Sequence, residues 1–130
     1  MSELQRPEFA DLLARRRTVG PGDVIFLEGH EPDALYVVLQ GEVQIVLTDS
    51  QGKQVVINRL KAGEIMGEVE LLGPHKQCTA TALSHDGCEL LAFDRAKVEA
   101  RVAAADPFVR FMMGHLCEII KGWTDAAKKS

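Results

Sequence analysis

Short apolar stretches and turn residues alternate through the middle of the chain. Residues 35–39 are continuously apolar, as expected for a buried strand, and residues 43–48 largely alternate apolar and polar side chains. Turn signals rich in Gly, Asp and Ser separate these stretches. About eight short strands are predicted, and they include residues 24–28, 54–60, 78–84 and 88–93. This spacing favours an antiparallel β-barrel, sandwich or jelly roll.

Helical signals lie on both sides of this strand-rich region. Residues 7–17 are predicted to form an N-terminal helix, with Phe9, Leu12 and Leu13 on one face. Asp94 is placed to cap a helix over residues 95–104. Asp106 followed by Pro107 predicts the start of a last helix that ends near Thr124. The prediction is one domain, residues 1–130, with an N-terminal helix in 1–17, the strands in 18–93 and two C-terminal helices in 94–125.

The last helix carries more apolar residues than docking on one domain requires. One stripe follows alternating three- and four-residue steps, the spacing at which helices pair in coiled coils. It consists of Val109, Met112, Leu116, Ile119 and Trp123. Phe108 and Phe111 lie on an adjacent face and are expected to pack on the sheets. We therefore predict a homodimer through the first stripe, with burial of both stripes inside one chain as the alternative.

Composition and charge fit a globular domain without a nucleic-acid footprint. The 130 residues are 46% hydrophobic and 26% charged, and the formal net charge is −4. No apolar run approaches the roughly 18 residues of a membrane span, and the N-terminus has no signal-peptide core. The three cysteines form no C-x-x-C pair and are interpreted as free thiols. These features predict a cytoplasmic protein that binds neither DNA nor a membrane.

The turn at Gly67 and Glu68 is the strongest candidate for chemistry. Glycine lets other groups approach the backbone closely, and residues 69–72 can form one helical turn whose free N–H groups attract anions. Glu68 adds a carboxylate at the same place. This combination suits a ligand with both sugar hydroxyls and a phosphate. A simple surface turn that needs a glycine remains the alternative.

Two segments resemble the cyclic nucleotide-binding domain, the family of catabolite activator-type regulators, protein kinase A regulatory subunits and cyclic nucleotide-gated channels. They read PGDVIFLEGHEPDALYVVLQGEVQIV and AGEIMGEVELLG. The resemblance covers about residues 10–124 and implies an antiparallel β jelly roll (a double-stranded β-helix) with flanking helices. It also implies that Glu68 binds the ribose 2′-hydroxyl and that backbone N–H groups, including that of Val69, bind the cyclic phosphate. The implied ligands are cyclic AMP or cyclic GMP.

The second segment departs from the family at the phosphate. The family's phosphate-binding arginine corresponds to Cys78 here, although Thr79 and Ala80 after it match. The small residue expected two positions after the glutamate is Glu70, and Met66 replaces an aromatic residue. A bidentate arginine–phosphate pair contributes about 1.5–3 kcal/mol. The candidate binding set is Gly67, Glu68, Val69, Lys76, Cys78, Thr79 and Ala80, with Lys76 as a substitute cation that cannot reproduce the arginine fork.

The resulting prediction is a non-enzymatic, stand-alone regulatory domain that senses a ligand. The residues after the last helix leave no room for the helix-turn-helix of the resembling transcription factors, so the output is expected to lie in a separate protein or in assembly itself. The alternative is a degenerate member that binds no nucleotide and acts as a dimerisation or protein-interaction module. A cupin-like metal site at Glu64, Glu68, Glu70 and His75 is a further possibility, but the closely spaced histidine pair of metal-binding cupins is missing, so no metal is predicted.

Overall fold

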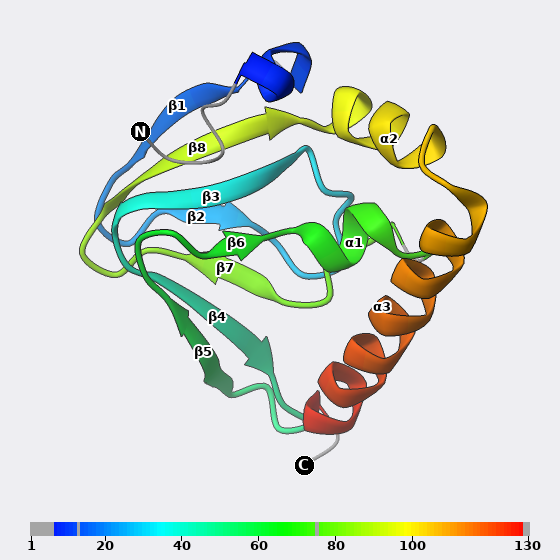
Figure 1. The fold of residues 1–130 in the computed structure, drawn as a ribbon. Helices are drawn as coiled ribbons and strands as arrows, with labels where there is room; N and C mark the ends of the chain where they lie inside the picture. Colours follow the sequence, from blue (N-terminus) through cyan, green and yellow to red (C-terminus); the bar gives the residue numbers. More distant parts are fainter. Residues whose placement is uncertain (1–6, 13, 75, 129–130) are drawn as a thin grey trace.

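Eight antiparallel strands form two four-stranded sheets in the computed structural model, which describes residues 7–12, 14–74 and 76–128 (Figure 1). The first sheet has the order β1 (Arg15–Val19), β8 (Cys88–Asp94), β3 (Ala34–Gly41) and β6 (Ile65–Met66). The second has the order β2 (Val24–Phe26), β7 (Thr81–Leu83), β4 (Val43–Thr48) and β5 (Gln54–Leu60). The jelly-roll prediction is confirmed.

The first sheet is covered on both faces. Val38 on β3 and Leu90 on β8 are fully buried in the core cluster that both sheets share. Val37 and Phe93 point to the other side and pack with a second cluster, to which the helices contribute Leu71 and Val98. Burial on both faces explains why β3 is a continuous apolar run rather than an alternating one.

The N-terminal helix prediction is correct only in its first half. The described part is a 3₁₀ helix, η2 (Pro7–Leu12), and Leu13 lies outside the described residues. The arginines at positions 15–17 belong to β1, which pairs with β8, so the jelly roll begins before Thr18. Arg17 donates to the Tyr36 hydroxyl over 2.9 Å and lies over the Tyr36 ring. Sheet pairing and this contact therefore override the helical pattern.

The C-terminal helices begin at the predicted caps. The Asp94 carboxylate accepts from the Lys97 N–H over 3.2 Å at the start of α2 (Arg95–Ala103). Asp106 accepts from the Phe108 N–H over 2.9 Å at the start of α3 (Pro107–Lys128), which extends beyond the predicted end at Thr124. Of the helices in the part of the chain that the structure describes, none has the length and hydropathy needed to cross a membrane.

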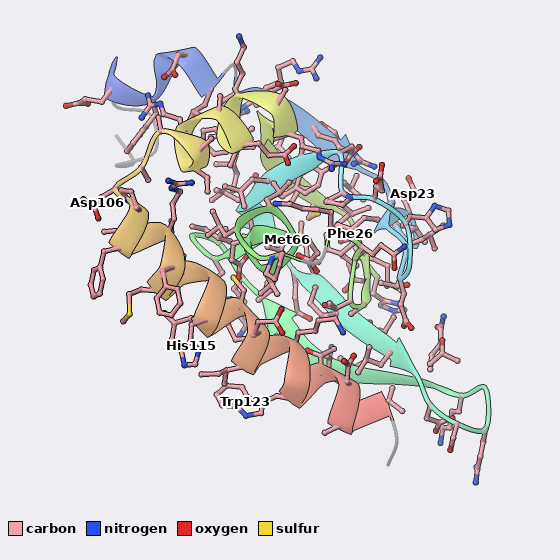
Figure 2. All side chains as sticks on the ribbon, turned by 90° about the vertical axis from the view of Figure 1, so that its right-hand side faces the viewer. Asp23, Phe26, Met66, Asp106, His115 and Trp123 are labelled. Atoms are coloured by element: carbon pink, nitrogen blue, oxygen red, sulfur yellow. The ribbon has the colours of Figure 1, made fainter. Side chains whose placement is uncertain are left out.

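The face of α3 that docks on the domain is neither of the two predicted stripes. Figure 1 shows α3 running past α1 (Glu68–Leu72) toward the ends of β4 and β5. Cys117 is buried at this contact, whereas Phe108 and Phe111 are each 70% exposed. The expectation that the two phenylalanines pack on the sheets is therefore wrong. Trp123 projects from the free edge of α3, as does His115 (Figure 2).

Gly73 allows α3 to approach α1 closely. A Cβ at Gly73 would lie 2.8 Å from the Cβ of Cys117 and 2.7 Å from the carbonyl oxygen of Val69. Gly73→Ala is therefore expected to push α3 outward and to lower the free energy of unfolding by about 1–3 kcal/mol. Thermal unfolding and hydrogen exchange of α3 measure the effect.

Gly114→Ala is the matched control, because a Cβ at Gly114 in α3 would meet nothing within 4 Å. That substitution is expected to leave stability unchanged or to raise it by up to about 1 kcal/mol, because alanine favours helix. Equal unfolding temperatures for the two variants would contradict close packing at Gly73.

Candidate functional site

A cavity of about 180 Å³ lies between the second sheet and α3, and we call it the helix-covered cavity. Phe26, Ile45 and Ile57 form part of its apolar wall. The cover comes from Ile120 and Thr124 of α3. The remaining side is the turn predicted from the sequence, residues 66–70, together with residues 79–80. The predicted turn therefore lines a cavity and is not a simple surface turn.

Gly67 has the left-handed backbone that starts α1. Its φ is 92° and its ψ is −4°, a conformation that residues with a side chain rarely adopt. A Cβ at this position would also lie 3.2 Å from the carbonyl oxygen of Ala34 on β3. The turn therefore requires glycine for two reasons, and it brings the first side chain of α1, that of Glu68, to the wall of the cavity.

Glu68 is half-buried, and one of its two carboxylate oxygens lacks a donor in the part of the chain that the structure describes. Its Oε2 atom is buried and has no hydrogen-bond partner among the described residues. Burial raises the pKa of the Glu68 carboxyl above its ordinary value, and the nearby charge of Glu70 raises it further. Native proteins rarely leave such a group unpaired, because its desolvation is uncompensated. A ligand hydroxyl or amino group in the cavity would supply the missing donor.

Glu68→Gln is expected to stabilise the ligand-free domain at neutral pH. The folded-state pKa of Glu68 is raised above the unfolded value of about 4.5. Below that value the carboxyl is protonated in both states, so it does not affect the free energy of unfolding. As the pH rises from the unfolded pKa to the folded pKa, the free energy of unfolding falls, because only the folded state keeps the proton. The expected gain at pH 7 is on the order of 1 kcal/mol, the lower end for an unsatisfied buried group. Thermal unfolding between pH 4 and pH 8 measures it.

The gain from Glu68→Gln should shrink toward pH 4, where the wild-type carboxyl is protonated as well. Asp86→Asn is the matched control, because the Asp86 side chain is 94% exposed. A stability difference between Glu68→Gln and the unmodified domain that does not change with pH would contradict a raised pKa at Glu68.

Glu70 uses the donors at the other end of the turn. Its side chain is buried, with 6% of its surface exposed. Its Oε1 atom accepts from the backbone N–H of Thr79 over 3.2 Å and from the Thr79 hydroxyl over 3.1 Å. Both residues line the helix-covered cavity. A carboxylate of the chain itself therefore takes two donors that could otherwise bind an anion.

Lys76 and Cys78 lie outside the helix-covered cavity. They line a neighbouring hollow of about 500 Å³, the outer hollow, together with Gly29, Gln77, Lys121, Asp125 and others. The Lys76 ammonium donates to the carbonyl oxygen of Leu71 over 2.8 Å and lies 3.8 Å from the Glu99 carboxylate. In this arrangement Lys76 is not the substitute cation considered from the sequence.

Cys78 is a buried thiol that stays protonated. It is 3% exposed, and burial raises its pKa to about 12, with a further contribution from the charge of Glu70. Its backbone N–H donates to the carbonyl oxygen of His30 over 2.7 Å. Cys78 therefore offers neither a positive charge nor a reactive thiolate to a ligand.

The structure thus gathers five of the seven candidate residues around one cavity. They are Gly67, Glu68, Val69, Thr79 and Ala80. Sequence reasoning missed the contributions of Ile57, Asn58 and the α3 residues Ile120 and Thr124. The positions 117, 120 and 124 do follow helical spacing, but the more apolar stripes beside them dominate the pattern.

The metal cluster considered from the sequence is not assembled. Across residues 7–12, 14–74 and 76–128, no group of three His, Cys, Asp or Glu side chains is arranged to hold a metal ion. Glu64 instead accepts from the backbone N–H of Lys61 over 2.7 Å. His75 lies outside the described residues.

The structure combines a jelly roll, a glycine–glutamate turn and a helix that covers the cavity beside that turn. Comparison with known proteins gives the family. The model of the cyclic nucleotide-binding domain matches residues 16–104. The chain belongs to the cyclic nucleotide-binding domain family, which confirms the resemblance seen in the sequence.

Relatives with known names support this assignment. The chain is 36% identical to cyclic nucleotide-gated channel beta-3 of Canis lupus familiaris over 93 residues, which are 68% of this chain and 12% of the channel subunit. It is 35% identical to the cyclic AMP receptor protein of Thermus thermophilus over 92 residues, which are 68% of this chain and 42% of the receptor. The chain therefore matches only a part of each relative.

A solved structure has the same fold. The EAL enzyme Bd1971 in its cAMP-bound form matches with a TM-score of 0.79 and 25% sequence identity. The match covers 87% of this chain and 30% of the enzyme chain.

Proposed function

We propose that this chain is a ligand-sensing regulatory domain and that the helix-covered cavity is its ligand site. The observation that carries the proposal is the buried, unpartnered Oε2 of Glu68 at the wall of that cavity. The family and the names of its members point to a cyclic nucleotide or a close chemical relative as the ligand class. Because the matched family is defined by ligand binding, we propose sensing and not catalysis.

The position of α3 supplies a route from ligand to output. Ile120 and Thr124 line the cavity from one face of α3, while Leu116 and Trp123 are exposed on the rest of its surface. A ligand that contacts the covering residues favours one position of the helix over others. The occupancy of the cavity then changes the surface that α3 offers to a partner.

We further propose that this partner surface pairs with α3 of a second copy. The stripe Val109, Met112, Leu116, Ile119 and Trp123 is exposed in the single chain. Its 3.5-residue repeat matches the same stripe on another copy, which is the arrangement that a two-fold dimer requires. An exposed apolar stripe of this kind is otherwise an aggregation hazard.

Two observations favour the alternative of a module that binds no nucleotide. Glu70 already occupies both Thr79 donors, and the candidate cation Lys76 is engaged elsewhere. In that case the domain would act through dimerisation or protein contacts alone. Ligand titration separates the two functions.

The test is calorimetry with cyclic AMP, cyclic GMP, adenosine and guanosine. At least one of these is expected to bind, and Glu68→Ala is expected to weaken that binding about 10- to 100-fold, since a hydrogen bond to a charged acceptor contributes about 1.5–3 kcal/mol. Asp86→Ala is the control at an exposed acid. Unchanged affinity in Glu68→Ala would place the ligand elsewhere, and the absence of any binding would favour the alternative function.

A further inference from the structure

The helix-covered cavity is acidic. Its lining includes the carboxylates of Glu68 and Glu70 and, among the described residues, no Lys, Arg or His. The described cations on the neighbouring segments have partners of their own. Arg59 donates to Glu42 and Lys121 donates to Asp125. Lys76 donates to the carbonyl oxygen of Leu71, and Arg95 donates to the carbonyl oxygen of Pro32 and to Glu99. A phosphate entering this cavity would meet two like charges and no opposite one.

The donors that face an anion are already used. Thr79 offers a backbone N–H and a hydroxyl at the cavity, and both bond to Oε1 of Glu70. A phosphate would have to displace a buried carboxylate from both bonds and would leave that carboxylate unpaired beside it. Glu70 therefore acts as a built-in anion at this end of the cavity.

The other groups suit an uncharged ligand. The walls include Phe26, Ile45 and Ile57, which favour a flat apolar ring system. The unpartnered Oε2 of Glu68 accepts from a hydroxyl or amino group. The volume of about 180 Å³ lies below the roughly 300–1,000 Å³ of ordinary ligand pockets, so it favours a ligand without an added phosphate.

We propose that the helix-covered cavity selects an uncharged nucleoside over a cyclic nucleotide, because Glu70 fills the place of the phosphate. The base would lie against the apolar wall, and a sugar hydroxyl would donate to Glu68. This inference rests on the proposed function and names the ligand class of the same site.

The test compares each nucleoside with the cyclic nucleotide of the same base. Calorimetric titrations of the 130-residue chain use adenosine against cyclic AMP, and guanosine against cyclic GMP. At least one nucleoside is expected to bind ten or more times tighter than its cyclic nucleotide. The ratio is measured on the unmodified protein, so it does not depend on a variant that folds.

Two variants then separate charge from occupancy. Glu70→Ala removes the charge and frees both Thr79 donors, so the preference for the nucleoside should fall at least tenfold. Glu70→Gln keeps an acceptor for Thr79 and removes only the charge, so its preference should fall less. Asp86→Ala should leave the ratio unchanged. Thermal unfolding shows whether each variant is folded.

The outcomes distinguish this inference from the proposed function. Tighter binding of the cyclic nucleotide, still dependent on Glu68, would overturn the nucleoside preference and leave the ligand site in place. An unchanged ratio in folded Glu70→Ala would overturn the role of Glu70. Binding of neither ligand at millimolar concentration would overturn both proposals.

Discussion

The double variant Glu70→Ala/Cys78→Arg is expected to bind cyclic AMP about 100-fold more tightly than the unmodified domain. Removing the Glu70 carboxylate frees the N–H and the hydroxyl of Thr79. An arginine at position 78 adds a charge-assisted contact to the phosphate, which contributes about 1.5–3 kcal/mol or a 10- to 100-fold gain in affinity. Calorimetry with cyclic AMP measures the total.

The two substitutions are expected to depend on each other. The charge of Glu70 acts on Cys78, so an arginine at position 78 alone would pair with Glu70 and not with a phosphate. Cys78→Arg by itself should therefore gain less than tenfold. Cys78 lines the outer hollow of about 500 Å³, which leaves room for the longer side chain.

The matched control for the added charge is Glu70→Ala/Gln77→Arg. Gln77 is the exposed neighbour of Cys78 in the outer hollow. An arginine at position 77 therefore adds the same charge nearby but not at the position from which contact with the phosphate is predicted. Equal affinities of the two double variants for cyclic AMP would show a general charge effect. That outcome would contradict a phosphate-binding site beside Thr79.

Leu116→Glu/Ile119→Glu is expected to give a folded monomer. Both side chains are exposed in the single chain, Leu116 by 54% and Ile119 by 38%, so the fold does not need them. In a paired α3 they would lie in the helix–helix seam, where four glutamates per dimer would repel each other and would be desolvated. Light scattering measures the mass, and circular dichroism checks the fold.

The unmodified protein is expected to have the mass of a dimer at about 100 μM, where even an interface of micromolar affinity associates. Ala100→Glu/Ala103→Glu is the matched control, because both alanines are exposed on α2 and outside the proposed seam. A monomer mass for the unmodified protein at that concentration would contradict the dimer proposal.

Local signals predicted most of the fold. The spacing of turns and apolar stretches indicates the strands, and the Asp94 and Asp106 caps mark both C-terminal helices. β1 was not predicted, because its sequence RRRTV has no strand pattern and becomes a strand only by pairing with β8. The docking face of α3 was not predicted either, because Cys117 and Thr124 are less apolar than the residues of the exposed stripes beside them.

The candidate site was predictable only where a backbone requirement appears in the sequence. Gly67 needs a left-handed backbone, and Glu68 follows it directly, so the turn is visible in a single sequence. The bonds between Glu70 and Thr79 join residues nine positions apart and depend on how the loop between them folds. No local sequence pattern predicts that contact, and none predicts that Ile120 of α3 covers the cavity.

Backbone amide NMR during titrations with adenosine and with guanosine tests the central claim most directly, because it locates the ligand. A ligand in the helix-covered cavity should shift the amide signals of Gly67, Glu68, Ala80 and Ile120 the most. The signals of Gly29, Gln77 and Asp125 in the outer hollow should shift little. The largest shifts at those outer residues, or no shifts at all with either nucleoside at millimolar concentration, would contradict the account.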